Sequence, residues 1–597
     1  MQPSRKAPYQ ETLVPPVLES VKTKDSAKWE TREEMDMADS KESTGSQEPL
    51  SPAARLLHAP RFNCTILAAI GCKTSINPGV IKMGLEQTLM KHPRFSKKLV
   101  IDDNKCGSKL KWESTAVNVE DHIIEPDLDP YMDSPDQFVE DYISNLSTIP
   151  LDLSKPLWEM HILNVKTLDA EAIAVFRIHH SLGDGASLIS LLLACTRQTS
   201  DPDALPSIPA QQRAGSHFSG GVWWLFFAIW TVLRLIWNTL VDLVLFVATM
   251  LYLEDTKTPL KGAYGVELKP KRFVHRTVSL DDIKLVKNAM NMTINDAIMG
   301  VTQAGLSRYL NRKYGECFFI LFKELVIVQF SRSRSRVRVR DSRDLTRLPG
   351  LIKYTFQGCD FLASNKKKSL QPFPIMQMVV DRLVLCCDKF CRGDQSEIED
   401  IENGKKNNIP KNIRLRASVL VNVRPTPGIQ ALADLMANES NNPRWGWGNR
   451  IGYIILPFTI GLQDDPLEHI RKAKAMIDRK KLSLEATFSF HSAMLVIKLF
   501  GAKASAAMAR RVVSNTTLAF SNVVGPVEEI SFYGHPVAYI APSVYGSPHA
   551  LTIHFQSYGR KMTIVVAVDP DVIPDPHELC DDLEKSLEII KHGVLMI

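Results

Sequence analysis

The sequence predicts a mixed α/β fold, because strand-like and helix-like patterns alternate along it. Two pairs of apolar runs with short polar links, at 158–178 and 551–568, are typical of antiparallel strand pairs. Helical periodicity appears at 186–197 and 293–310, and an amphipathic pattern closes the chain at 576–591. The composition, 45% hydrophobic and 23% charged, is that of a globular protein. Wholesale disorder and a polytopic membrane protein are therefore excluded.

The chain begins with a polar segment, 1–48, whose only aromatic residues are Tyr9 and Trp29. Such a segment buries too little apolar area to offset its chain entropy, so we expect a disordered tail. The ordered sequence then starts with a strand-like run at 62–71. Asn77 and Pro78 are typical of the start of a helix.

The strand-like run at 172–178 leads directly into the motif HHSLGDG, and a helix pattern follows it. This context predicts a strand-to-helix turn that carries His179, His180, Asp184 and Gly185. A histidine in a cleft is the usual general base near neutral pH, because its ordinary pKa is about 6.5. An alcohol that attacks a thioester needs one such base and a second group to fix the ring. Asp184 would either contribute to this site or only organise the turn.

Signatures of other catalytic classes are missing from the sequence. We find no GxSxG, HExxH, GxxxxGK[ST] or dinucleotide-binding GxGxxG motif. The pattern HxxxxD, from His179 to Asp184, resembles the box of glycerolipid acyltransferases. The doubled histidine and the following glycine favour a different acyltransferase family.

A long apolar segment at 221–253 contains Trp223, Trp224, Trp230 and Trp237. It is long enough to cross a bilayer, for which about 20 residues suffice. However, its polar residues (Arg234, Asn238 and Asp242) recur every four positions and form one stripe on a helix. A tryptophan-rich helix with such a stripe suits a membrane interface, and a buried soluble helix is the alternative.

In the second half, Thr293 and Asp296 have the spacing of a capping box at the start of a helix. Strand patterns return at 413–425, 448–458 and 516–526. The intervening segment 317–400 has a biased composition without sustained periodicity, which indicates a retained intron or a disordered insertion; an RNA-binding arginine tract is the alternative. Much of the net charge of +6 lies there, so we expect no nucleic-acid partner.

Taken together, the motifs resemble the plant wax ester synthase/diacylglycerol acyltransferase family. The resemblance covers 49–316 and 405–597, in order. It rests on HHSLGDG (179–185), PLWE (156–159), NDAIMG (295–300), NVRP (422–425), GNRIGYIILPF (448–458) and SNVVGP (521–526).

This resemblance implies a fold similar to chloramphenicol acetyltransferase, with two related α/β domains and the active site in a tunnel between them. We expect these domains at 49–215 and at 265–316 with 401–597, joined by the hydrophobic helix at 221–253. The implied enzyme uses acyl-CoA as a substrate, without a cofactor or metal, to esterify long-chain alcohols and diacylglycerol. It implies membrane lipids as partners and the endoplasmic reticulum membrane as the location, with the catalytic body cytosolic and the plasma membrane as the alternative.

Carried over by motif, the resemblance makes His180 the general base and gives His179 and Asp184 supporting roles. The residues expected near substrate are Gly185, Pro156, Leu157, Trp158, Asn295 and Asp296. For Trp158, a place in the hydrophobic core is an equal alternative. For Asp296, the alternative is its role in the capping box.

Two other functions compete with a membrane-associated lipid acyltransferase. One is a soluble HHxxxDG acyltransferase of secondary metabolism or a peptide condensation domain, and the other is a non-catalytic lipid-binding protein. Because 221–253 lies between the two predicted domains, a single membrane crossing would separate them. We therefore expect a helix that lies in the membrane plane or re-enters it.

Overall fold

The structure is a computed structural model that divides into two compact units. One unit contains 1–306 and 412–597, and the other contains 307–411. The fold and the site below belong to the first unit. The residues that the structure describes are 47–102, 109–129, 131–209, 222–334, 407–424 and 447–596. The predicted tail up to residue 46 and most of the segment 317–400 lie outside them.

The first sheet has seven strands, in the order β5-β6-β7-β2-β14-β13-β8. Its central strands pair antiparallel, and β6 and β7 are the pair predicted at 158–178. A separate sheet of three strands has the order β1-β4-β3. The bounds are β1 (Gln47–Pro49), β2 (Thr65–Cys72), β3 (Lys97–Asp102), β4 (Lys109–Ser114), β5 (Ile123–Ile124), β6 (Trp158–Leu163), β7 (Ala172–His179), β8 (Thr196–Gln198), β13 (Ile530–Phe532) and β14 (His535–Tyr545).

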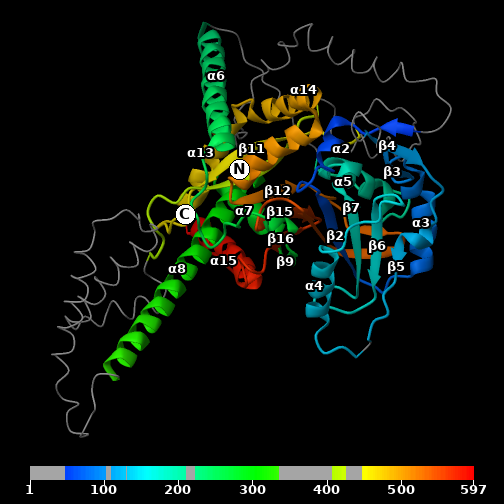
Figure 1. Ribbon diagram of the computed structural model, residues 1–597, viewed down its shortest axis with the longest axis horizontal. Helices are drawn as coiled ribbons and strands as arrows, with labels where there is room; N and C mark the ends of the chain where they lie inside the picture. The colour runs from blue at the N-terminus through cyan, green and yellow to red at the C-terminus, as the bar shows by residue number, and fades with distance from the viewer. Residues whose placement is uncertain are drawn as a thin grey trace, which may run out of the picture. The chain divides into compact units, whose positions relative to one another are not determined.

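The second sheet has six strands, in the order β11-β10-β12-β15-β16-β9. The pair β15 and β16 is the second predicted antiparallel pair, whereas β10, β12 and β15 run parallel. The bounds are β9 (Arg272–Ser279), β10 (Leu415–Asn422), β11 (Ile451–Phe458), β12 (Leu518–Val523), β15 (Leu551–Tyr558) and β16 (Lys561–Val568). The predicted α/β architecture with two sheet-rich halves is confirmed (Figure 1).

One predicted domain boundary is wrong. The prediction gave 401–597 to the second domain, but β13 and β14 complete the first sheet, where β14 pairs with β2 along its length. Periodicity in the sequence identifies a strand but not its partner, so this exchange could not be foreseen. The strand β1 begins at Gln47, two residues before the predicted end of the tail, and pairs there with β4.

The helices predicted to start at 78, 186, 221, 293 and 576 begin within one residue of those positions. The helix bounds are α2 (Pro52–Leu56), α3 (Pro78–Gln87), α4 (Pro135–Leu146), α5 (Gly185–Cys195), α6 (Val222–Leu251), α7 (Leu280–Ala289), α8 (Ile294–Arg334), α13 (Leu467–Lys481), α14 (Glu485–Ser514) and α15 (Pro576–Leu595). Asn77 caps α3 by accepting a hydrogen bond from the Gly79 N–H (3.0 Å). The helix α8 continues to Arg334, past residue 316, where the prediction ended regular structure.

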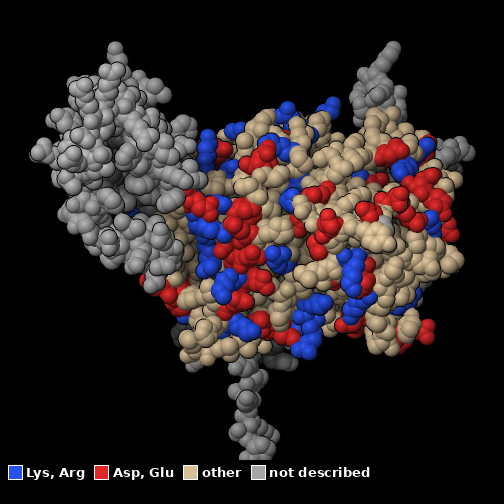
Figure 2. All heavy atoms as spheres, turned by 90° about the horizontal axis from the view of Figure 1, so that it is seen from below, with Lys and Arg blue, Asp and Glu red and all other residues tan. Residues whose placement is uncertain are grey.

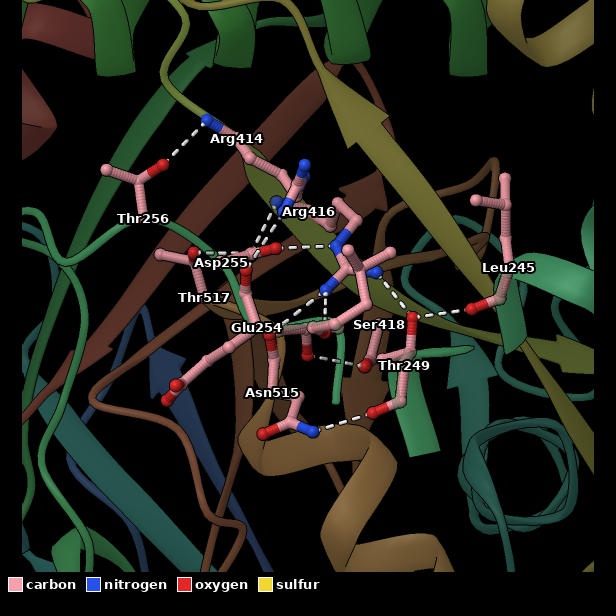
Figure 3. A network of polar contacts seen from close by, with 12 residues as sticks. Leu245, Thr249, Glu254, Asp255, Thr256, Arg414, Arg416, Ser418, Asn515 and Thr517 are labelled. Atoms are coloured by element: carbon pink, nitrogen blue, oxygen red, sulfur yellow. Dashed lines mark hydrogen bonds and ion pairs between the residues drawn. The ribbon is translucent and has the colours of Figure 1, made fainter. Parts of the chain in front are cut away.

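The C-terminal end of α6 is held by a buried ion pair between Arg416 of β10 and Asp255, which follows the helix (2.5 Å) (Figure 3). Arg416 also donates hydrogen bonds to the Thr249 hydroxyl and the Leu253 carbonyl of this helix end. Asp255 accepts a further bond from the Thr517 hydroxyl (2.7 Å). Both charged side chains are almost fully buried, so each depends on the other for its solvation.

We expect Asp255→Asn to destabilise the protein by about 3–5 kcal/mol, because it leaves the Arg416 guanidinium buried without a counter-charge. Denaturant unfolding of the purified protein in detergent, followed by tryptophan fluorescence, measures the change. The matched control is Glu254→Gln, since Glu254 is exposed next to it. Equal effects of the two substitutions would contradict this role of the ion pair.

Candidate active site

The motif HHSLGDG lies where it was predicted, in the turn between β7 and α5. The strand β7 ends at His179, a short 3₁₀ turn spans His180–Leu182, and α5 begins at Gly185. The neighbouring strands fix both histidines through the backbone. The His179 N–H donates to the Leu157 carbonyl (2.9 Å), and the His180 N–H donates to the Cys64 carbonyl (3.0 Å).

His180 is buried and is held by Asn449, which comes from the second half of the chain. The Asn449 Nδ2 donates to the backbone carbonyl of His180 (2.8 Å), and this bond fixes which way the amide points. Its Oδ1 therefore faces the His180 Nδ1 (3.0 Å) and accepts a hydrogen bond from it. Because the ring proton is on Nδ1, the lone pair of Nε2 is available to take a proton from a substrate.

Burial lowers the pKa of His180 below its ordinary value of 6.5. The charge of Asp184 and the hydrogen bond to Asn449 oppose this shift in part. A histidine with a lowered pKa is neutral at pH 7, which is the protonation state that a general base requires.

Asp184 acts on His180 through other residues rather than by direct contact. It caps α5 by accepting from the Ser187 N–H (3.0 Å) and forms a buried ion pair with Arg424 (2.7 Å). It also accepts from the N–H of Arg450 (3.1 Å), the residue that follows Asn449. The predicted supporting role of Asp184 therefore takes a specific form: it orders both the turn and the segment that carries Asn449.

His179 has both ring nitrogens occupied. Its Nε2 lies 2.7 Å from the Asn63 Oδ1, and its Nδ1 lies 2.7 Å from the Ser181 hydroxyl. The ring also stacks on that of His58, with centroids 4.1 Å apart. Burial, with the neighbouring His58 and His180, lowers its pKa well below the ordinary value. The structure thus separates the two histidines: His179 supports the turn, and His180 has a nitrogen for chemistry.

Leu157 and Trp158 were expected near substrate, but the structure favours packing roles for both. Neither has exposed surface. The Trp158 Nε1 donates to the Phe95 carbonyl (3.0 Å), and its ring stacks on His122 with centroids 4.2 Å apart. Pro156 precedes them and is buried as well. The motif PLWE therefore contributes to the site mainly through the Leu157 carbonyl that holds His179.

Asn295 and Asp296 lie in different environments. The capping box is confirmed, because Asp296 accepts from the Thr293 N–H (2.8 Å) and donates its own N–H to the Thr293 hydroxyl (3.3 Å). Its side chain is fully buried, so the structure shows the capping role that was the alternative to a contact with substrate. Asn295 is exposed and its Oδ1 accepts from Asn522 Nδ2 (2.6 Å), at the end of β12.

Gly185 lies where the two halves approach each other. A Cβ added at this glycine would meet the Val523 side chain at 3.8 Å, at the carboxyl end of β12. On the adjacent strand β15, His554 is half-buried, and desolvation together with the nearby His180 lowers its pKa to about 4. The first half of the chain thus contributes β7, the turn His180–Leu182 and α5 to the site. The second half contributes β12, β15 and the segment 447–450.

Several residues of this site were not predicted, namely Arg424, Trp447, Asn449 and His554. Trp447 donates its Nε1–H to the Leu182 carbonyl (2.8 Å) in the turn that His180 begins. Arg424 and Asn449 were signalled only by their places in the motifs NVRP and GNRIGYIILPF, and Trp447 and His554 lie outside both motifs. Within the ranges that the structure describes, no group of three or more His, Cys, Asp and Glu residues is placed to hold a metal ion.

Comparisons with known proteins agree with this geometry. The family description "Wax ester synthase/diacylglycerol acyltransferase catalytic domain" matches residues 79–298, and "WS/DGAT C-terminal domain" matches residues 447–591. Wax ester synthase/diacylglycerol acyltransferase 11 from Arabidopsis thaliana is 47% identical over 92% of this chain and 96% of its own length. The chain belongs to the wax ester synthase/diacylglycerol acyltransferase family.

A second Arabidopsis relative supports the assignment. Wax ester synthase/diacylglycerol acyltransferase 5 from Arabidopsis thaliana is 48% identical over 92% of this chain and 94% of its own length. Among solved structures, the wax ester synthase/diacylglycerol acyltransferase from Marinobacter aquaeolei VT8 is 14% identical over 92% of this chain and 99% of its own, with a TM-score of 0.47. This chain is therefore an acyltransferase of that family, and its HHxxxDG motif forms the site described above.

We expect Asn449→Ala to lower kcat about 100-fold with little change in KM, because His180 loses the bond that fixes its ring. The acid limb of the pH profile of kcat/KM should fall below pH 6.5 in the wild type, since burial lowers the His180 pKa. It should move to still lower pH in the variant, because the bond to Asn449 raises that pKa. Asn145→Ala, at an exposed position of α4, is the control. An unshifted limb would contradict this positioning role.

Proposed function

We propose that this protein is an acyl-CoA-dependent O-acyltransferase that esterifies long-chain alcohols to wax esters and diacylglycerol to triacylglycerol. The observation that carries the proposal is the buried His180, whose Nδ1 is committed to Asn449 and whose Nε2 is available as a base. The names of the Arabidopsis relatives supply the two substrate classes.

The reaction that this geometry supports needs one base and no covalent intermediate. The Nε2 of His180 takes the hydroxyl proton of the alcohol as its oxygen attacks the thioester carbonyl of acyl-CoA. When the tetrahedral intermediate collapses, the C–S bond breaks and the imidazolium returns the proton to the departing CoA sulfur. The products are an ester and free CoA, and the enzyme regains its neutral histidine.

The proposed location is the endoplasmic reticulum membrane, with the catalytic body in the cytosol. By length and composition, α6 and α14 could each cross a bilayer. The first half of α6 exposes many large apolar side chains, with Trp230 and Trp237 60% and 68% exposed. That part, before Asn238, is about 16 residues or 24 Å long, which is less than the roughly 30 Å of a hydrocarbon core. Its length fits insertion into one side of the membrane.

The second half of α6 packs one face against the protein, and its polar residues make the contacts. Asp242 is fully buried and pairs with Lys480 (3.0 Å) and Arg479 (2.5 Å) at the end of α13. Asn238 donates to the Arg479 carbonyl (3.3 Å). Arg234, nearer the exposed end, is itself exposed. The stripe therefore docks the helix through Asn238 and Asp242, while Arg234 lies on the exposed part.

The competing functions have less support. A soluble acyltransferase of secondary metabolism would leave the exposed aromatic side chains of α6 without a purpose. A non-catalytic lipid-binding protein was considered because 317–400 could disrupt the second half. However, the second sheet carries six paired strands, and Asn449 and Arg424, which lie next to its strands β11 and β10, bond to His180 and Asp184.

We expect His180→Ala to abolish ester formation while protein abundance stays near that of the wild type. The assay is neutral-lipid analysis after expression in a host that lacks neutral-lipid synthesis. His577→Ala, at an exposed position of α15, is the matched control and should retain full activity. Ester yield near the wild-type level in the His180 variant would refute the assignment of the base.

We also expect the segments before and after α6 to lie on the same side of the membrane. The strand β14 pairs with β2, and β9 pairs with β16, so both segments build one body. Glycosylation acceptors placed at the exposed Tyr131 and at Asp571 should both remain unmodified in microsomes. A glycosylated acceptor at only one position would show that the membrane separates the halves.

A further inference from the structure

The helix α14 is a hairpin rather than a straight rod. Gly501 has a φ of 82°, which breaks the helix near its middle. The Ser505 hydroxyl then donates to the Ala493 carbonyl (3.3 Å), although twelve residues separate them. In a continuous helix the same residues would be about 18 Å apart. The two arms therefore fold back on each other, and neither arm is long enough to span a bilayer.

The turn of this hairpin carries the most exposed apolar side chains of α14. Leu499 is 62% exposed and Phe500 is 72% exposed, with Leu495 on the arm before them. The opposite side of the arms is buried, through residues such as Ile497 and Val512. A hairpin with one face on the protein and an apolar face in water is unfavourable unless another apolar phase covers it.

The charges of α14 indicate what covers that face. Its single acidic residue, Glu485, is buried and pairs with Lys480 (2.5 Å). Lys498 and Lys503, on either side of the turn, are both exposed. Basic residues beside exposed apolar ones are the pattern of a helix at the surface of an anionic bilayer, which attracts them electrostatically.

The face seen from below has a different character. Figure 2 shows basic and acidic residues interspersed on it. In the view of Figure 1, α14 lies above the second sheet, and α15 lies below it. Exposed ion pairs such as Arg276 with Asp581 (3.0 Å) and Lys585 with Glu588 (2.9 Å) involve α15. Such a surface is typical of contact with water, so the hairpin differs from the rest of the unit.

The hairpin also connects α6 with the catalytic turn. At its base, the Leu484 N–H donates to the Thr239 hydroxyl of α6 (3.1 Å), and Phe488 packs on Phe246. Elsewhere α14 packs against α2, and α2 packs against the turn that begins with His180. In Figure 1 the bend of α14 lies beside α2. His58, just after α2, reaches the Ser181 hydroxyl (2.9 Å).

We propose that the α14 hairpin lies in the plane of an anionic phospholipid bilayer, with its turn at the membrane surface next to the active site. The exposed half of α6 anchors the enzyme, and the hairpin sets its orientation, so that a membrane-dissolved acyl acceptor reaches His180 without crossing water. This inference rests on the proposed function for the identity of the acceptor, whereas the docking itself does not depend on it.

The test uses the full-length protein and the double variant Leu499→Ser with Phe500→Ser. Two acceptors are compared: diacylglycerol in vesicles of phosphatidylcholine with phosphatidylserine, and a short water-soluble alcohol. We expect the rate with the vesicle-borne acceptor to fall at least about tenfold, because two apolar side chains no longer enter the lipid. The rate with the soluble alcohol should stay within about twofold. Leu168→Ser, at a position 90% exposed in the link between β6 and β7, is the control and should change neither rate.

A second experiment measures the contact between the hairpin and the lipid directly. A photoactivatable phosphatidylserine in the same vesicles should crosslink to the 495–503 region and not to the region around Leu168. In vesicles of phosphatidylcholine alone, Lys498→Glu with Lys503→Glu should have no effect, whereas with phosphatidylserine it should remove the added rate that this lipid gives. Equal loss with both acceptors, or no crosslink at the hairpin, would overturn the proposal. No ester from either acceptor in the wild type would instead refute the proposed function, and the crosslinks would still decide the docking.

Discussion

The buried ion pair between Asp184 and Arg424 is the interaction on which the active site depends. Its carboxylate is the cap of α5, the partner of Arg424 and the acceptor of the Arg450 N–H. One side chain thus joins the catalytic turn to two segments of the second half. The Asn449 amide that orients His180 lies between these contacts in the sequence. A charge buried to this degree requires all of its partners, so the turn is ordered only when both halves are assembled.

Strand exchange provides the framework for that assembly. Because β14 adds to the first sheet beside β2, the chain of the second half crosses into the first before it returns as β15. The two sheets are therefore linked by continuous backbone on each side of the β13–β14 pair, from β12 before it and to β15 after it. This linkage explains why the residues around His180 keep their geometry although they come from segments hundreds of positions apart.

The sequence was informative wherever the determining interactions are local. The pairs β6/β7 and β15/β16, the capping box at Thr293 and the turn that carries His180 all follow from patterns within a few residues. The roles of Arg424 and Asn449 could not be predicted, since their partners lie 240 and 269 positions away. The same limit explains the misplaced β14, because its apolar run does not show which sheet it joins. Trp158 was ambiguous for a different reason: burial in a core and burial in a tunnel wall leave the same sequence signal.

By hydropathy alone, α6 and α14 are equivalent candidates for crossing a membrane. The structure shows that neither helix has a free apolar length sufficient to cross it. In α6 the half after Asn238 is fixed by Asp242 and by the Arg416 network, which leaves too short a free length to reach the far leaflet. In α14 the left-handed backbone at Gly501 divides one long apolar segment into two arms. In α6 the polar residues, through the protein groups they bind, determine how much of the helix can enter lipid, and in α14 the backbone break does so. For an enzyme whose proposed acceptors are themselves dissolved in the membrane, limiting insertion to one face keeps the site at the boundary where acyl-CoA arrives from water.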